Sequence, residues 1–163
     1  MNPFKIGPIC RSLGAILLFI STFAVAQEAS EITKWNVQLS KPTAKPGEVV
    51  DIIFSATIED AWKLYSSDFA SDIGPLPTEF NFDKATSYAL VGSIQAINPK
   101  KTVDPAWDQP YTYFAKKAEF RQKIKVLSSG YRVTGTIKGL LCSTKNGLCI
   151  PFSEAFKTGA QGL

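Results

Sequence analysis

The sequence predicts an all-β protein, an immunoglobulin-like antiparallel β-sandwich, and three observations carry this prediction. Apolar and polar residues alternate with a period of two in several segments, as they do in half-buried strands. Gly, Pro and Asn/Asp turns separate these segments, and no segment of useful length has the helical period. Strands with one apolar face need a second sheet to cover it, so two packed sheets are expected.

The first 26 residues are expected to be a secretory signal peptide. Lys5 and Arg11 precede or flank an apolar run at 13–23, and Ala24-Val25-Ala26 offers small residues for cleavage. A membrane anchor would need roughly 20 apolar residues, about twice this run. We therefore expect Cys10 to leave with the leader, and residues 27–163 to form one exported, soluble domain with its core at about 32–157.

The strands are expected in chain order along this domain. Alternation is clearest at 50–58, 118–126 and 131–141. Shorter candidates lie at 32–39, 62–66, 79–82, 88–97 and 153–157. This gives about eight strands. The strand at 62–66 contains two aromatic residues, Trp62 and Tyr65, that we expect in the core.

Composition excludes several classes of function. The formal net charge is +4 and includes Lys5 and Arg11 of the leader, which leaves too little positive charge to indicate nucleic-acid binding. The chain has no histidine, which removes Ser-His-Asp and Cys-His catalysis and histidine zinc sites. We expect no cofactor and no metal.

Two cysteines remain after the leader, Cys142 and Cys149, and an Asn-Gly pair between them indicates a hairpin turn. Facing residues of an antiparallel pair lie close enough for a disulfide. Parity places Cys142 on the face opposite Leu141, away from the core and near the sheet edge, where a thiolate partner would reach the bond. The bond would close a short loop, with a loop-closure contribution on the order of 2.5 kcal/mol. A structural staple and an exchanging disulfide both remain open at this point.

Five segments together resemble one family: residues 62–66, 74–80, 120–124, 139–142 and 148–151. In order and spacing they are similar to the amino-terminal periplasmic domain of the thiol:disulfide interchange protein DsbD, over roughly residues 35–157. The resemblance implies an immunoglobulin-like sandwich whose redox-active cysteine pair passes electrons from a membrane-embedded reductase to periplasmic thiol proteins. It also implies that Cys149 bonds the client and that Cys142 resolves the mixed disulfide.

The sequence departs from this family in two places. The loop between the cysteines is long for the family, and Pro151-Phe152 stands where Pro-Pro is frequent. The sequence also ends at Leu163, soon after Cys149, so we expect the transmembrane and thioredoxin-like domains of the full enzyme to be absent and the electron donor to be a separate polypeptide.

A segment at 98–117 shows no strand pattern and is expected to be a loop. Its aromatic residues either plug the end of the sandwich or, as the resemblance implies, form a cap over the cysteines. Two acids of this segment would tune a thiol pKa or act as turn residues. The candidate cap residues are Asp104, Trp107, Asp108, Tyr111, Tyr113 and Phe114.

The interpretation is a periplasmic, monomeric thiol:disulfide exchange module that acts through Cys142 and Cys149. Its expected partners are thioredoxin-fold thiol proteins and a separate membrane-embedded thiol reductase. The alternative is a secreted immunoglobulin-like binding module in which the same disulfide is structural. A metal-delivery role is weaker, because two cysteines without histidine leave a metal site half ligated.

Overall fold

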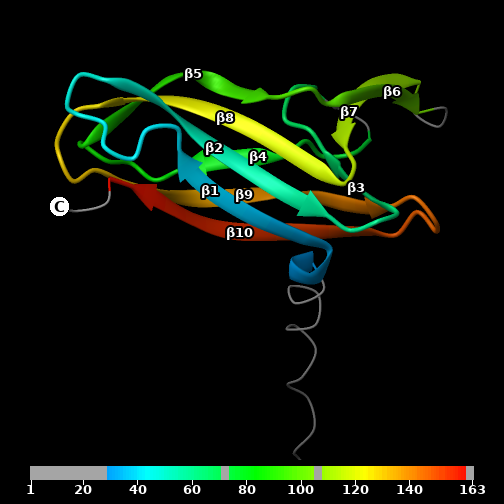
Figure 1. Cartoon of the computed structure of the whole chain (residues 1–163). Coiled ribbons are helices and arrows are strands. Elements are labelled where there is room, and N and C mark those ends of the chain that lie inside the picture. The colour runs from blue at the N-terminus through cyan, green and yellow to red at the C-terminus, as the bar shows by residue number, and fades with distance from the viewer. Residues whose placement is uncertain (1–28, 71–73, 105–107, 161–163) are drawn as a thin grey trace, which may run out of the picture.

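The alternating segments form strands in a computed structural model, which describes residues 29–70, 74–104 and 108–160 (Figure 1). The strands are β1 (Thr33–Leu39), β2 (Val49–Ile58), β3 (Trp62–Tyr65), β4 (Glu79–Phe82), β5 (Tyr88–Ala96), β6 (Lys100–Asp104), β7 (Gln109–Phe114), β8 (Lys117–Val126), β9 (Arg132–Ser143) and β10 (Cys149–Gly159). The expected leader lies outside the described residues. Within them, no helix is long and apolar enough to cross a membrane.

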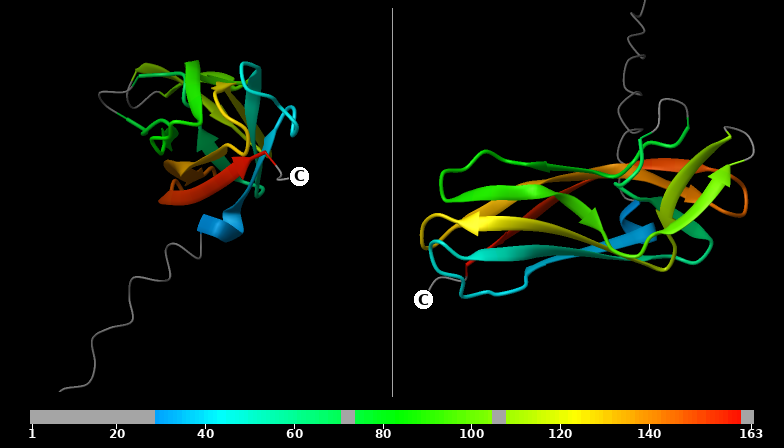
Figure 2. Two further views of the ribbon diagram at one scale, coloured as in Figure 1. Left: turned by 90° about the vertical axis from the view of Figure 1, so that its left-hand side faces the viewer. Right: turned by 90° about the horizontal axis from the view of Figure 1, so that it is seen from above.

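Two antiparallel sheets make up the fold, and they pack face to face (Figures 1 and 2). One sheet has the order β1-β2-β8-β5, and the other has the order β10-β9-β3-β7-β6. Strand β4 also pairs with β9, at residues 135–138, while β3 pairs with β9 at 141–143. The predicted immunoglobulin-like sandwich is therefore confirmed. In the second sheet, β9 pairs with β10, β3 and β4.

The core lies between the sheets and follows the period-two pattern. Every second residue of β2, from Val50 to Ile58, is buried; β8 shows the same alternation, and β9 shows it from Val133 to Ile137. Phe54 of β2 links the two sheets, since its ring centroid lies 4.8 Å from that of Phe80 and 5.0 Å from that of Phe156. This packing fixes which face of β9 points outward.

The segment at 98–117 was expected to be a loop, and this prediction is wrong. It contains the antiparallel hairpin β6–β7, which lies at the same end of the sandwich as the turn between β9 and β10 (Figures 1 and 2). Lys100, Lys101 and Thr102 occupy consecutive positions of β6, so the strand has no apolar face for a sequence pattern to reveal. Strand pairing with β7 forms it instead.

Strand β10 begins earlier than the predicted 153–157, and Pro151 is the reason that the pattern hides its start. Ser143 donates its N–H to the Leu148 carbonyl at 2.8 Å, which makes that pair a hydrogen-bonded one. By the alternation of an antiparallel ladder, Pro151 then falls in a pair without hydrogen bonds, with its nitrogen toward the free edge. Proline costs no ladder bond at such a position.

Candidate functional site

The site begins at the hairpin of β9 and β10, where Cys142 and Cys149 are direct cross-strand partners. Their Cα atoms lie 4.1 Å apart, and the two sulfurs are joined in a disulfide. Asn146 accepts the Leu148 N–H at 3.1 Å through its side-chain oxygen, and Gly147 has a φ of 72°, which suits glycine. The hairpin and the cross-strand bond predicted from the Asn-Gly turn are thus present.

The two ends of the disulfide differ in exposure. Cys149 is exposed at the first residue of β10, the edge strand of its sheet. Cys142 is only 2% exposed, although it points away from the main core as its parity predicts. The expected outer-face, edge position therefore holds, but only one of the two sulfur-bearing residues is open to an approaching protein.

Aromatic side chains on the outer face of the six-stranded sheet cover Cys142. We call Tyr65, Phe69, Tyr111 and Tyr113 the aromatic cluster; together with Leu140 they pack around this cysteine. The ring centroids of Tyr65 and Tyr111 lie 5.3 Å apart, and those of Tyr111 and Tyr113 lie 5.9 Å apart. Tyr65 was expected in the core, so its place in this cluster is a difference from the sequence interpretation.

The candidate cap residues separate in the structure. Tyr111 and Tyr113 belong to the aromatic cluster, whereas Phe114 points inward, with its ring centroid 5.0 Å from that of Phe120. Asp108 is exposed, with a φ of 49°, in the turn between β6 and β7, which is a turn residue's position. Asp104 ends β6, but its side chain lies outside the described part of the structure, as does Trp107 altogether.

Lys63 is a site residue that the sequence interpretation missed. It is the cross-strand partner of Cys142 on β3, so both side chains lie on the outer face. Its Nζ donates a hydrogen bond to the Tyr111 hydroxyl at 2.9 Å and lies 5.2 Å and 5.1 Å from the ring centroids of Tyr65 and Tyr111. The parity of β3, with Leu64 in the core, would have placed Lys63 on the outer face, although it does not give its partner on β9.

The environment of Lys63 keeps it cationic. Burial lowers the pKa of its ammonium, but the hydrogen bond to Tyr111 and the interactions with Tyr65 and Tyr111 outweigh burial, so the pKa lies above its usual value. Within the described side chains, Lys63 forms no salt bridge. A positive charge without a carboxylate partner among the described side chains therefore lies on the face of the sheet that carries the disulfide.

The hairpin β6–β7 is attached to the rest of the sheet at few points. Strand β7 pairs with β3 only at Leu64–Phe114 and Tyr65–Tyr113, and Ser66 donates its N–H to the Thr112 carbonyl at 2.9 Å. Strand β6 pairs with β7 alone. A hollow of about 410 Å³ lies between residues 68–70 and the hairpin. Side chains add two further links, since the Thr112 hydroxyl donates a hydrogen bond to the Asp68 carboxylate and Lys63 donates one to the Tyr111 hydroxyl.

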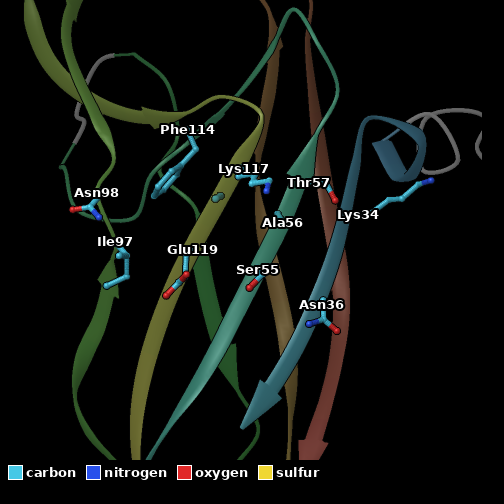
Figure 3. Close-up of a pocket in the computed structure, with 11 residues that line it drawn as sticks. Lys34, Asn36, Ser55, Ala56, Thr57, Ile97, Asn98, Phe114, Lys117 and Glu119 are labelled. Atoms are coloured by element: carbon cyan, nitrogen blue, oxygen red, sulfur yellow. The ribbon is translucent and has the colours of Figure 1, made fainter. Parts of the chain in front are cut away.

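Another hollow, of about 490 Å³, lies on the four-stranded sheet and is shown in Figure 3. Asn36, Ser55 and Glu119 point into it from β1, β2 and β8, and neither Cys142 nor Cys149 lines it. It brings together none of the predicted site residues except Phe114.

Comparison with solved structures places the fold among known domains. The N-terminal domain of DsbD from Neisseria meningitidis, in its reduced form, matches with a TM-score of 0.53 and 14% identity, over 82% of this chain and 89% of that one. The N-terminal periplasmic domain of ScsB from Proteus mirabilis matches with a TM-score of 0.50 and 16% identity, over 77% of this chain and 44% of that one. At these identities the likeness concerns the fold.

Family comparison goes further than the fold. A search of curated proteins finds no match. The family model described as "Thiol:disulfide interchange protein DsbD, N-terminal" matches residues 33–160, which include all ten strands up to Gly159 and both cysteines of the hairpin. Because this match spans most of the sequence, the chain belongs to the family of N-terminal domains of the thiol:disulfide interchange protein DsbD.

Proposed function

We propose that this domain carries electrons between a membrane-embedded thiol reductase and thioredoxin-fold thiol proteins of the periplasm, through the Cys142–Cys149 disulfide. The observation that carries the proposal is the asymmetry of the pair, with Cys149 exposed on an edge strand and Cys142 2% exposed beneath the aromatic cluster. An exchanging disulfide needs one accessible sulfur and one neighbour that stays with the protein to resolve the intermediate.

Each half of the cycle balances without a cofactor. A donor thiolate attacks Cys149 Sγ, the S–S bond breaks, and its electron pair leaves on Cys142 Sγ as a thiolate. The second thiol of the donor then attacks the mixed disulfide and frees Cys149. Towards a client, the Cys149 thiolate attacks the client disulfide, and the Cys142 thiolate then attacks Cys149 Sγ and releases the client as a dithiol.

The hairpin β6–β7 is assigned the role of a cap. Tyr111 and Tyr113 pack in the cluster that covers Cys142. Because β7 pairs with β3 at only two positions, a docking partner could move the part of the hairpin that carries these two rings while Phe114 stays in the core. The periplasmic location is supported by the sequence features of the leader and by the description of the Proteus mirabilis neighbour as a periplasmic domain.

Trapping tests the proposal directly. In Cys142→Ala, a mixed disulfide on Cys149 cannot be resolved internally, so disulfide-linked thioredoxin-fold proteins or a membrane thiol reductase should accumulate in cells. The matched control is Cys149→Ala, which leaves only the covered Cys142 and should trap far less. If Cys142→Ala traps no more than the double variant while the wild-type bond stays oxidised, the disulfide is a staple and the binding-module alternative replaces electron transfer.

A further inference from the structure

The charged group closest in register to the buried sulfur is the ammonium of Lys63. Cys142 and Lys63 are paired across β9 and β3. Cys142 shares a buried cluster with Tyr65 and Tyr111, the two rings over which the Lys63 Nζ lies. The other titratable residues facing this site from neighbouring strands are Cys149 on β10 and Tyr113 on β7. Lys63 thus supplies the positive charge among the described groups packed around Cys142.

We propose that Lys63 stabilises the thiolate that Cys142 becomes when the disulfide opens. The role of Lys63 in exchange rests on the proposed function. The effect of its charge on the Cys142 thiol is a property of the reduced domain and can be measured without any partner. Lysine carries three N–H donors, and the Tyr111 hydroxyl accepts one of them. The ammonium can therefore turn toward a new anion on its own face of the sheet while it stays over the tyrosine rings.

The step in which this matters is the attack on Cys149 Sγ. The incoming thiolate forms a bond to Cys149 Sγ, the S–S bond breaks, and the electron pair and negative charge move to Cys142 Sγ. A leaving thiol departs faster when its thiolate is better stabilised. Because Cys142 is 2% exposed, water solvates this thiolate poorly, and a nearby cation replaces that solvation. Lys63 would therefore speed the opening of the bond and enrich the reactive form of the resolving cysteine.

A purely structural role for Lys63 predicts the opposite sign. Its hydrogen bond to Tyr111 ties β3 to the hairpin β6–β7, so loss of the side chain would loosen the cap. A looser cap would let a small reagent reach Cys142 more easily and would make its alkylation faster. Loss of charge stabilisation would leave less thiolate and would make alkylation slower. The direction of the change in rate separates the two roles.

The experiment uses a Cys149→Ser background, in which Cys142 is the one thiol of the domain after leader removal, and follows iodoacetamide alkylation by mass spectrometry from pH 6 to 10. In this background Lys63→Met should lower the alkylation rate at neutral pH about threefold. The thiolate fraction falls about tenfold on loss of a nearby opposite charge, and the greater nucleophilicity of the more basic thiolate offsets part of this fall. The midpoint of the pH profile should move upward.

Lys63→Arg keeps the charge and should restore the wild-type profile. Lys123→Met, which removes an exposed lysine of the four-stranded sheet, is the matched control and should leave the profile unchanged. An unchanged or faster alkylation in Lys63→Met, or an equal loss in Lys63→Arg, overturns the proposal. Because the assay needs no partner, failure of trapping in Cys142→Ala would reject electron transfer without affecting this result, and the reverse also holds.

Discussion

Leu141 and Cys142 are neighbours on β9 that point to opposite faces of the sheet, and both are buried. Leu141 is 0% exposed between the two sheets, and Cys142 is 2% exposed under the aromatic cluster. Equal burial conceals different kinds of cover. The cover of Leu141 is the sandwich itself, in which β2 and β8 are paired along most of their length. The cover of Cys142 is the aromatic cluster, whose side chains come from β3, from the segment that follows it and from the hairpin β6–β7.

The comparison teaches that burial alone does not measure how firmly a residue is enclosed. Exposing Leu141 requires the sheets to separate, which is global unfolding. Exposing Cys142 requires the side chains of the aromatic cluster to move, and two of them, Tyr111 and Tyr113, lie on a hairpin that is joined to β3 at two paired positions. Segments with few attachments open at a lower free energy than the core. A reactive residue can therefore be covered at rest and still be reached.

Replacing leucines on the two faces should give the largest contrast in stability. Leu141→Ala should lower the free energy of unfolding by about 3 kcal/mol, because it leaves a cavity between the sheets. Leu140→Ala, on the cysteine's face and only partly buried, should lower it by about 1 kcal/mol. Urea unfolding of the oxidised domain measures both. Equal losses would show that the aromatic cover is as firmly packed as the core.

Removing a ring from the cover should affect access more than stability. Tyr111→Ala should cost about 1 to 2 kcal/mol, less than a core aromatic, because the hairpin can loosen without opening the sandwich. In the Cys149→Ser background, the same change should make alkylation of Cys142 faster. Tyr111→Phe keeps the ring and serves as the control for access. If Tyr111→Ala alkylates no faster than this control, the ring does not shield the sulfur.

The smallest expected effect on stability comes from removing the hydroxyl groups of two tyrosines, Tyr131 on the core side and Tyr111 on the outer face. Burial, and to a lesser degree the charge of Glu48, raises the pKa of Tyr131 on the core side. A raised folded-state pKa gives stability that is complete below the unfolded value, about 10, and is lost as the pH rises beyond it. The Tyr131 hydroxyl has no hydrogen-bond partner among the described residues, so Tyr131→Phe should change stability at pH 7 by less than about 1 kcal/mol.

The measurement for this prediction is denaturant unfolding at pH 7 and at several values above pH 10. Tyr131→Phe should lose less stability than the wild type over the alkaline range, since the buried phenol that resists ionisation is gone. Tyr111→Phe is the companion variant on the outer face. It removes the hydroxyl that accepts a hydrogen bond from Lys63. An alkaline loss identical in Tyr131→Phe and wild type would contradict the assignment.

The predictable part of the fold is the part that has an apolar face. The alternation at 50–58 and 118–126 predicts β2 and β8, because one face of each strand enters the core. Strand β6 and the start of β10 were missed for a physical reason: β6 has Val103 as its one apolar residue and so lacks an apolar face, and β10 has Pro151 at the free edge. Edge strands are defined by backbone pairing, which leaves little trace in side-chain type.

The site was predictable to the same degree. The Asn-Gly turn and strand parity place the disulfide in the hairpin with Cys142 on the outer face, as the structure has it. The burial of Cys142 did not follow, because it depends on Tyr65 and Tyr111, which come from segments distant in the sequence. Lys63 was missed for the same reason: its pairing with Cys142 is a property of the β3–β9 register, which no local pattern encodes.

The free edge at β10 has a consequence for the solubility of the domain. Cys149 falls in a pair without hydrogen bonds, so its backbone N–H and carbonyl point outward at the edge, where another strand could add to the sheet. Pro151, the next residue with that orientation, has no N–H to offer. A strand from another molecule can therefore form hydrogen bonds with the backbone of Cys149, but it receives no N–H hydrogen bond from Pro151. Pro151 thus limits the addition of further strands, and with it fibril-like assembly, at an edge where Cys149 has to remain accessible for disulfide exchange.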